Sequence, residues 1–445
     1  MGNFFLGVLV TLVALVSIGL TVFKVFRRGA LTFEVEGFYS HVMDGDSGPL
    51  FRDIQRDAQT AELCRVDDPL ACSVRDAVLC HSQEGPEECN VLLLSGGGQW
   101  GAFGAGLFDT LSRKSGAPEL ALPGIGVITG ISTGSLQTMM LMVALDEKQT
   151  PEMRRFAIDR MLWGYSPEKE SDVVDHNGLL TVPLYGSAAG TAPLRKRIIE
   201  ALAPGGDYRL VDAIGASSVA GYAGFVEAER GIFRYADLRE LVNKAASKAA
   251  ATEALAAATM ASSAMPIFHQ QLRVAGSGGK ALSLYDGGVR RSVFFDRAMA
   301  LVDKEVREAM ASHGMTKTAA VTQEAFSEEY RRKAPKVFVV RNGPTVRKFD
   351  QTLNHKSGPL ENGQRGYDLL VNESEIGAIA SLRLSNPYGE ILVTTADQYD
   401  TFPSEVGENF KKDEMFKPAF MARLRDLGRY KAERAGGAFW PLSTL

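Results

Sequence analysis

Ser132 lies in a pattern that could supply a nucleophile. It is the central residue of G-x-S-x-G, between Gly130 and Gly134, and an apolar run precedes it. Glycines flank such a serine because the backbone turns sharply from strand to helix and leaves little room for side chains. The turn places the hydroxyl at a helix N-terminus, where unpaired N–H groups favour negative charge. The bare pattern also fits a serine that only caps a helix.

A glycine run forms a second segment that could do chemistry. Ser95 precedes it, and Gln99 and Trp100 lie within it. Exposed N–H groups in such a loop can stabilise the oxyanion of acyl transfer, by about 3–4 kcal/mol per donor. The candidate donors lie at Gly96, Gly97, Gly98 and Gly101. A phosphate loop would need a Gly-Lys-Ser/Thr ending, and a dinucleotide site would need an acidic residue where the chain has Ser132.

Asp286 is the leading candidate for the base that a serine nucleophile requires. It ends a short apolar run and is followed by Gly287 and Gly288, which suits a tight turn that presents a carboxylate. Asp-Gly pairs also occur in turns without any chemistry. A Ser–His–Asp arrangement would need His313 or His355, which lie in polar or charged surroundings.

The elements around these residues predict a parallel sheet covered by helices. Short apolar runs at 91–95 and 125–129 read as buried strands, and residues 101–112 have helical spacing between them. A strand, a helix and a strand at this distance form a βαβ unit. The serine segment leads into a further apolar helix at 135–145. The expected fold is a three-layer α/β/α domain with a central, mainly parallel sheet.

The remainder of the chain continues this alternation. Alanine-rich residues 239–262 predict a helix that ends before Pro266. Further helices are expected at 298–333 and 415–434, and further buried strands at 337–340 and 391–395. No long low-complexity linker divides residues 91–445, so these residues are expected to form one α/β hydrolase domain with a helical C-terminal extension.

The N-terminus predicts a membrane anchor. Residues 4–23 carry no charge, and twenty helical residues span roughly 30 Å, the thickness of the hydrocarbon core. A signal peptide would have a basic residue before the apolar run and a small-residue cleavage site after it. We therefore expect a retained single-pass anchor with its basic flank at 1–28. Lys24, Arg27 and Arg28 favour a cytoplasmic catalytic domain.

Residues 29–90 are interpreted as a juxtamembrane stem, with a short strand at 31–35. All four cysteines lie here, and an even, clustered number indicates two disulfides and an oxidising compartment. That conflicts with the basic flank, so the side of the membrane stays open. The cysteines, at 64, 72, 80 and 89, lack the C-x2-C pairs typical of a zinc site.

Composition narrows the class of protein. The chain has 445 residues, 45% of them hydrophobic, and a net charge of −4. These values are ordinary for a folded protein and lack the basic character of a nucleic-acid binder. We therefore expect no nucleic-acid partner. We also expect no metal and no cofactor, because acyl transfer by a serine and a carboxylate requires neither of them.

In combination and order, these motifs resemble the patatin-like phospholipases, lipid acyl hydrolases that use a Ser–Asp dyad. The resemblance covers residues 91–295 and includes the segment Ala261-Ser262-Ser263-Ala264-Met265-Pro266, similar to the family's A-S-x-A-x-P. It implies that Ser132 is the nucleophile and Asp286 the base. It further implies that the glycines at 96, 98 and 101 belong to the oxyanion loop.

The resemblance also implies a substrate and a membrane setting. The substrate would be a lipid or phospholipid acyl ester, cleaved at a bilayer to which the anchor holds the enzyme. The chain departs from the family at Trp100, where the family has Arg or Lys, so a preference for charged phospholipids does not follow. Two alternatives remain at this point: a Ser–His–Asp carboxylesterase or thioesterase, and a catalytically silent membrane scaffold.

Overall fold

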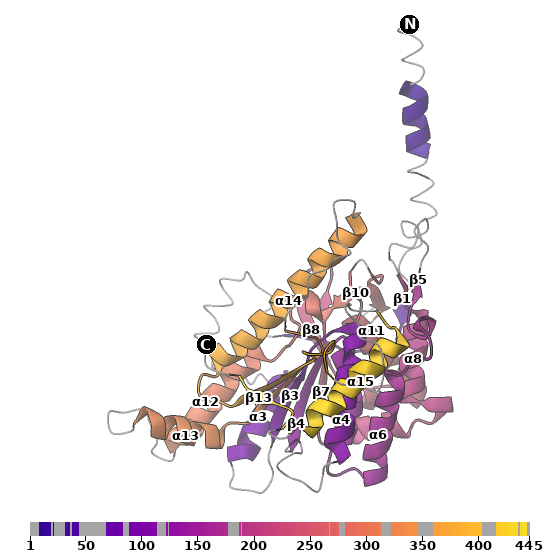
Figure 1. Cartoon of the computed structure of the whole chain (residues 1–445). Coiled ribbons are helices and arrows are strands. Elements are labelled where there is room, and N and C mark those ends of the chain that lie inside the picture. The colour runs from indigo at the N-terminus through magenta and orange to yellow at the C-terminus, as the bar shows by residue number, and fades with distance from the viewer. Residues whose placement is uncertain are drawn as a thin grey trace.

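One large sheet runs through the part of the chain that the computed structural model describes (Figure 1). The described residues are 9–18, 21, 32–35, 38–43, 68–82, 89–113, 122, 124–176, 187, 189–266, 268–275, 281–312, 322–345, 359–402, 415–434 and 437–442. Within them, eleven strands belong to this sheet and two more form a small separate pair, β5 (Asp175–His176) and β6 (Ala189–Gly190).

The strand order of the main sheet is β1-β9-β10-β7-β4-β3-β11-β12-β13, with β8 also pairing β7, and β2 pairing β8. The strands are β1 (Thr32–Glu34), β2 (His41–Val42), β3 (Asn90–Leu94), β4 (Ile125–Ile131), β7 (Ala220–Glu227), β8 (Ile232–Asp237), β9 (Leu272–Ala275), β10 (Ala281–Asp286), β11 (Val337–Arg341), β12 (Ile391–Thr395) and β13 (Trp440–Pro441). All four strands expected from residue 91 onward are present.

The sheet is mixed. Its middle, from β7 through β4, β3 and β11 to β12, is parallel. Strands β8 and β10 pair antiparallel with β7, and β13 pairs antiparallel with β12. The expectation of a mainly parallel sheet therefore holds for the middle, and β1 also pairs parallel with β9 at one edge. The sequence analysis did not predict β8, β10 or β13 as strands, because these segments are shorter or more polar than the apolar runs that it took as buried strands.

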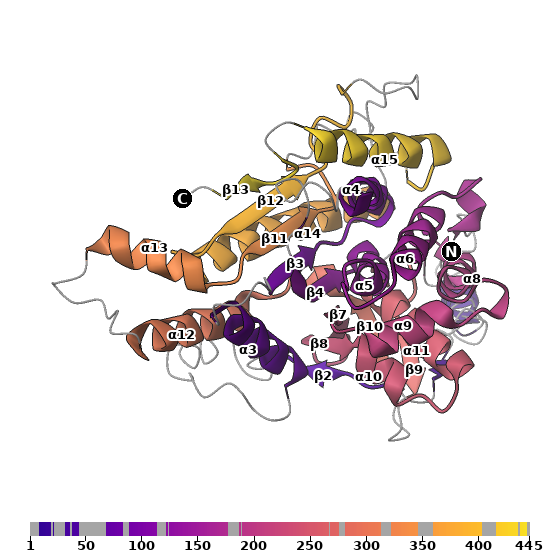
Figure 2. The ribbon, with the colours of Figure 1, turned by 90° about the horizontal axis from the view of Figure 1, so that it is seen from below.

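Helices cover both faces of the sheet (Figure 2). One face carries α4 (Gly101–Arg113), α5 (Thr133–Ala144), α6 (Pro151–Gly164), α8 (Ala192–Leu202), α9 (Arg209–Ala216), α10 (Leu238–Asn243), α11 (Lys248–Ser262) and α15 (Pro418–Glu433). The other carries α3 (Pro69–Ser82), α12 (Asp296–Ser312), α13 (Gln323–Lys333) and α14 (Pro359–Ser385).

Strand β3 explains why there are two cores. Leu92 and Leu94 pack in one core, whereas Val91 and Leu93 pack in the other, and all four are almost completely buried. Successive side chains of a strand point to opposite faces, so a continuous apolar run needs a layer of helices on each side. The layering expected from the sequence is therefore present.

The alanine-rich region forms two helices, α10 and α11, where the sequence predicted one. Ser247 begins the second helix, since its side chain accepts a hydrogen bond from the backbone N–H of Ala250 at 3.1 Å. In a continuous helix this N–H group would bond to a backbone carbonyl one turn earlier. Its bond to a side chain instead marks the start of a new helix. The second helix ends at Ser262, four residues before Pro266.

The described parts of residues 29–90 belong to the same domain and are not a separate stem. Strand β1 pairs with β9, β2 pairs with β8, and α3 packs on the sheet. The Tyr222 hydroxyl donates to the Pro69 carbonyl oxygen at 2.8 Å, and Tyr235 hydrogen-bonds to Asp68. A disulfide joins Cys80 to Cys89, one of the two expected. Cys64 lies outside the described residues.

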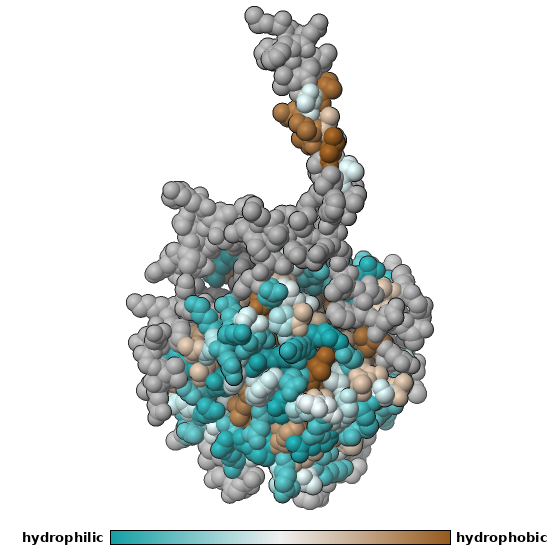
Figure 3. Space-filling view, turned by 90° about the vertical axis from the view of Figure 1, so that its right-hand side faces the viewer, coloured by the Kyte–Doolittle hydropathy of each residue, from teal (hydrophilic) through white to brown (hydrophobic). Residues whose placement is uncertain are grey.

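The predicted anchor at 4–23 lies only partly within the described residues. Of it, residues 9–18 are helical and expose apolar side chains, with Leu9 and Val10 each 60% exposed (Figure 3). In the described part of the chain, we find no helix with both the length and the apolar character needed to cross a membrane.

Candidate active site

The turn after β4 holds Ser132 in a strained conformation. Its φ is +52°, a region that residues with a side chain seldom adopt, and α5 begins at the next residue. A Cβ on Gly130 would lie 2.2 Å from the Gly134 carbonyl oxygen, and one on Gly134 would lie 2.5 Å from the Leu94 carbonyl oxygen. Both glycines are therefore needed for the close approach of strand and helix. The sharp turn expected from the motif is present.

The glycine loop after β3 lies against this turn. A Cβ built on Gly96 would lie 3.4 Å from the Ser132 Cβ. Gly97 and Gly98 have φ of +145° and +55°, and a Cβ on Gly97 would lie 2.0 Å from the Asn342 carbonyl oxygen. Both positions therefore favour glycine for their backbone conformation, and Gly97 also for lack of space. The structure brings Gly96, Gly97 and Gly98 to the same site as Ser132.

Gly101 has a different position from the other predicted loop glycines. It is the first residue of α4, and a Cβ there would lie 1.9 Å from the Thr133 hydroxyl oxygen and 2.6 Å from the Tyr165 ring. It is not among the described residues that line the cavity at Ser132. Its small size is thus explained by close packing between α4 and the start of α5.

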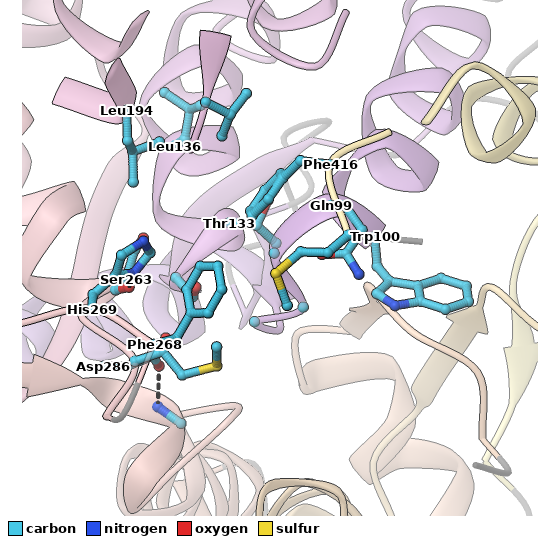
Figure 4. A pocket seen from close by; sticks show the side chains of 18 of the residues that line it. Gln99, Trp100, Thr133, Leu136, Leu194, Ser263, Phe268, His269, Asp286 and Phe416 are labelled. Carbon is cyan, nitrogen blue, oxygen red and sulfur yellow. Dashed lines mark hydrogen bonds between the residues drawn. The ribbon is translucent and has the colours of Figure 1, made fainter. Parts of the chain in front are cut away.

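Asp286 lies at the end of β10, with its side chain buried. Its carboxylate accepts a hydrogen bond from the Gly288 backbone N–H at 2.7 Å (Figure 4). Burial raises the pKa of Asp286 to about 7, and the hydrogen bond from Gly288 and the influence of the Ser132 side chain oppose this rise. A carboxyl group with this pKa can hold or release a proton near neutral pH.

Of the two glycines after Asp286, Gly287 packs against the serine turn and Gly288 packs against Asp286 itself. A Cβ on Gly287 would lie 2.6 Å from Ile131 Cδ1 and 2.7 Å from the Gly224 carbonyl oxygen, so a larger residue would collide with the backbone of β7. A Cβ on Gly288 would lie 3.1 Å from the Asp286 carboxylate. The structure places Ser132 and Asp286 in the wall of the same cavity.

A segment at the end of α11 contacts both residues. The Ser132 backbone N–H donates to the Ser262 hydroxyl at 2.7 Å, and that hydroxyl donates to the Gly224 carbonyl oxygen at 2.6 Å. The Asp286 backbone N–H donates to the Ala264 carbonyl oxygen at 3.0 Å. Residues 262–264 thus connect the candidate nucleophile with the candidate base through hydrogen bonds.

Asn342, directly after β11, supports the glycine loop. Its backbone N–H donates to the Ser95 hydroxyl, and its side-chain NH2 donates to the Ser95 carbonyl oxygen, each at 3.0 Å. The same NH2 group donates to Gln137 Oε1 at 2.9 Å, while Gln137 Nε2 donates to the Gly101 carbonyl oxygen. Asn342 is 2% exposed, so water does not compete for these bonds.

A cavity of about 370 Å³ contains the serine, the aspartate and the glycine loop (Figure 4). Most of its other walls are apolar, which suits a hydrocarbon ligand. The apolar side chains that line it include Leu136, Val173, Leu194, Ile198, Met265, Phe268, Val371, Met415, Phe416 and Met421. They come from both helical layers and from the chain before α15.

Trp100 contributes packing to this region. It is 3% exposed and makes edge-on contacts with Tyr399 and Phe420, at 4.8 and 5.3 Å between ring centroids. In Figure 4 its ring points away from Asp286. At this position the chain therefore has an uncharged anchor for α15.

His269 is a cavity residue that the sequence did not indicate. Its Nδ1 donates to the Ser263 carbonyl oxygen at 3.2 Å, and its Nε2 has no hydrogen-bond partner among the described residues. Burial lowers its pKa to about 4, so the ring is neutral. His313 and His355, the histidines considered from the sequence, lie outside the described residues. In the described ranges, no group of His, Cys, Asp or Glu could hold a metal ion.

Comparison with known proteins gives one family. Residues 92–299 match the family model of the patatin-like phospholipases, and this segment includes Ser132, Asp286 and the glycine loop. No curated protein sequence matches the chain. Among solved structures, the chain is similar to VipD from Legionella pneumophila, with 11% identity over 77% of this chain and 67% of that chain, and a TM-score of 0.28.

Proposed function

The chain contains a patatin-like phospholipase domain at residues 92–299, and on this premise we propose that it is a serine hydrolase of lipid acyl esters. Ser132 is the proposed nucleophile and Asp286 the proposed base. The observation that carries the proposal is the position of Ser132, on a strained turn and in the same cavity as the buried carboxyl group of Asp286.

The proposed reaction has two steps. In the first, Asp286 takes the proton of the Ser132 hydroxyl while the oxygen bonds to the ester carbonyl carbon. The tetrahedral intermediate then expels the alcohol, which receives that proton from Asp286, and an acyl-serine remains. In the second, water gives a proton to Asp286 and attacks the acyl-serine. The tetrahedral intermediate then releases the fatty acid, and Asp286 returns the proton to the Ser132 oxygen.

The glycine loop is the proposed oxyanion hole. Gly96 lies next to Ser132, and Gly97 and Gly98 adopt backbone conformations that only glycine tolerates well. Backbone N–H groups already held in place cost no reorganisation during the reaction, which makes them effective toward a developing charge. The bonds from Asn342 to Ser95 support the proposal that this loop is held rigid.

The substrate is proposed to be a lipid at a membrane surface. The apolar cavity wall suits an acyl chain, and the uncharged segment at 4–23 suits a single-pass anchor. A tether would keep the cavity at high effective substrate concentration without increasing affinity for any one lipid. The side of the membrane on which the domain lies stays a prediction to be tested by thiol labelling in intact cells.

The test is hydrolysis of acyl esters by the purified full chain in detergent micelles. Ser132→Ala and Asp286→Asn are each expected to lower fatty-acid release by a factor on the order of 10³ or more. Asp237→Asn is the matched control, because Asp237 is also buried with a raised pKa but is not among the described cavity residues. A fluorophosphonate probe should label the wild type at Ser132. Hydrolysis that survives Ser132→Ala would refute the proposal.

His269 provides the one specific observation for a second candidate, a serine esterase that uses histidine as its base. It lies in the same cavity, and its ring is neutral. His269→Gln separates the two candidates: the Ser–Asp proposal expects activity to persist and Asp286→Asn to abolish it. The reverse result would make His269 the base. Absence of both labelling and hydrolysis in folded protein would favour the scaffold.

A further inference from the structure

The charge of the cavity wall comes from few residues. Of the described residues that line the cavity, Arg197 is the one with a basic side chain and Asp286 the one with an acidic side chain. The histidine, His269, is neutral because burial lowers its pKa. The remaining lining residues are apolar or neutral and polar. Among the described lining residues, Arg197 is therefore the one cationic side chain that a bound ester could meet.

Arg197, on α8, is held in a fixed orientation. Its Nε donates to the Gly164 carbonyl oxygen at 2.8 Å and its Nη2 to the Trp163 carbonyl oxygen at 2.6 Å. The guanidinium also lies over the Trp163 ring, 4.5 Å from its centroid. These contacts use two of the five N–H donors of a guanidinium. The others remain for a ligand, and the side chain is already ordered.

Arg197 has no carboxylate partner in the described part of the chain. The negative charges of Asp172 and Glu168 raise its pKa, but neither residue forms an ion pair with it among the described residues. The positive charge of Arg160 lowers its pKa. Burial lowers the pKa of Arg197, as expected for a cation withdrawn from water without a counter-ion. An anionic group would supply the missing counter-charge and form charge-assisted hydrogen bonds.

A chain of contacts connects Arg197 to the nucleophile. Arg197 binds Gly164, and the next residue, Tyr165, donates its hydroxyl proton to the Thr133 carbonyl oxygen at 2.6 Å. Thr133 directly follows Ser132. The guanidinium therefore lies on the side of the cavity formed by α6 and the start of α5, where part of an ester bound at Ser132 could reach it.

We propose that Arg197 is a specificity-determining residue that binds an anionic group on the alcohol part of the ester, so that the site prefers such esters to their neutral counterparts. This inference rests on the proposed function. Trp100 contributes no charge, so Arg197 is the cavity's own source of anion recognition.

Arg197 also has a structural role, and a second arginine separates the two. Its hydrogen bonds satisfy carbonyl groups at the C-terminus of α6, which a basic side chain stabilises. Arg425 does the same from α15, donating Nη1–H to the Tyr165 carbonyl oxygen at 2.6 Å. Arg425 is not among the described residues that line the cavity. Arg425→Met therefore removes a comparable cap without changing the charge of the cavity wall.

The experiment compares two substrates with the same acyl chain, a monoacylglycerol phosphate and a monoacylglycerol, in micelles of a nonionic detergent. The measured quantity is the ratio of their kcat/KM values in the full chain. Arg197→Met should lower this ratio by about 10- to 100-fold, the loss expected for a charge-assisted hydrogen bond. Arg197→Lys should lower it less, because it keeps the charge. Arg425→Met should lower Tm and leave the ratio unchanged.

Three results would overturn the inference. The first is an equal fall in kcat/KM for both esters in Arg197→Met, which would assign the residue to helix capping only. The second is an equal change of the ratio in Arg425→Met. The third is wild-type protein that cleaves the neutral ester through Ser132 but does not favour the anionic one. Failure to cleave either ester would instead refute the proposed function, and the inference with it.

Discussion

The backbone N–H of Ser132 donates a 2.7 Å hydrogen bond to the side-chain hydroxyl of Ser262. That hydroxyl has a single proton, and it donates this proton to the Gly224 carbonyl oxygen on β7. Ser262 is completely buried, so the serine turn is connected to the neighbouring strand through one ordered hydroxyl. Two residues later, the Ala264 carbonyl oxygen accepts from the Asp286 backbone.

The first prediction follows from this arrangement. Ser262→Ala should leave the Ser132 N–H and the Gly224 carbonyl group buried without partners, at a cost of about 1–3 kcal/mol each. A turn that is no longer held should also lower kcat by about 10- to 100-fold, because small displacements of a nucleophile are costly. Urea unfolding and ester hydrolysis measure the two effects.

Ser217→Ala is the matched control for Ser262→Ala. The Ser217 hydroxyl likewise donates to one carbonyl oxygen, that of Met142, and accepts from one backbone N–H, that of Val219. It is not among the described cavity residues. The control should lose similar stability while keeping kcat. An equal fall of kcat in both variants would show that Ser262 acts through general stability alone.

The second prediction concerns pH and rate. Asp286 must be ionised to accept the serine proton, and its pKa is raised to about 7. The kcat/KM for a neutral ester should therefore rise with pH and level off above about 7. A profile already flat from pH 5 upward would mean that another group, or a far more acidic carboxyl, is the base.

The third prediction concerns pH and stability. Because the folded state raises the pKa of Asp286 above its usual value of 3.8, folding favours the protonated form. This contribution is complete below pH 4 and is lost as pH rises through about 7. Asp286→Asn removes the buried charge, so it should stabilise the protein increasingly over this range, by at most on the order of 4 kcal/mol at pH 8. Thermal unfolding at pH 5 and pH 8 should reveal a larger gain at pH 8.

The fourth prediction tests the support of the glycine loop. Asn342→Ala removes the NH2 group that donates to the Ser95 carbonyl oxygen and to Gln137. We expect a fall in kcat of about tenfold or more with little change in KM, because the loop is proposed to act on the transition state. Asn386→Ala, at another buried asparagine, is the control. A change in KM alone would contradict this role.

The fifth prediction compares two helical glycines. Gly134→Ala would place a Cβ 2.5 Å from the Leu94 carbonyl oxygen and 2.8 Å from that of Ser95, so it should destabilise the protein by about 1–3 kcal/mol. Gly377 in α14 has open space around it, and Gly377→Ala should stabilise by up to about 1 kcal/mol. Chemical unfolding of both variants checks the opposite signs. Equal effects would contradict the steric argument.

The sequence predicted the central strands and the position of Ser132 because these features are local. The apolar runs that became β3 and β4 need burial on both faces, and the glycines around Ser132 reflect a sharp turn. Asp286 was identified by the need for a base and by the glycines that follow it. Apart from the need for a base, each of these inferences depends on neighbours within a few residues.

Residues that act through tertiary contacts were harder to predict. Nothing near Asn342 in the sequence indicates that it binds the loop at Ser95, 247 positions earlier. Arg197 and His269 enter the cavity because α8 and the segment after α11 pack there. Gly101 fitted the glycine pattern, yet its surroundings are those of close helix packing. Strands β8, β10 and β13 were missed because they are shorter or more polar than the apolar runs that indicate a buried strand.

Strand β7 lies between the strands that carry the serine and the aspartate. In the sheet register, Ile131 is opposite Gly224, and Asp286 is opposite the next residue, Phe225. The spacing between nucleophile and base is thus set by two steps of backbone hydrogen bonding, whatever the number of residues that connect them. Chains of this architecture could therefore gain or lose whole insertions between the two residues during evolution while their reacting groups stay at the same separation.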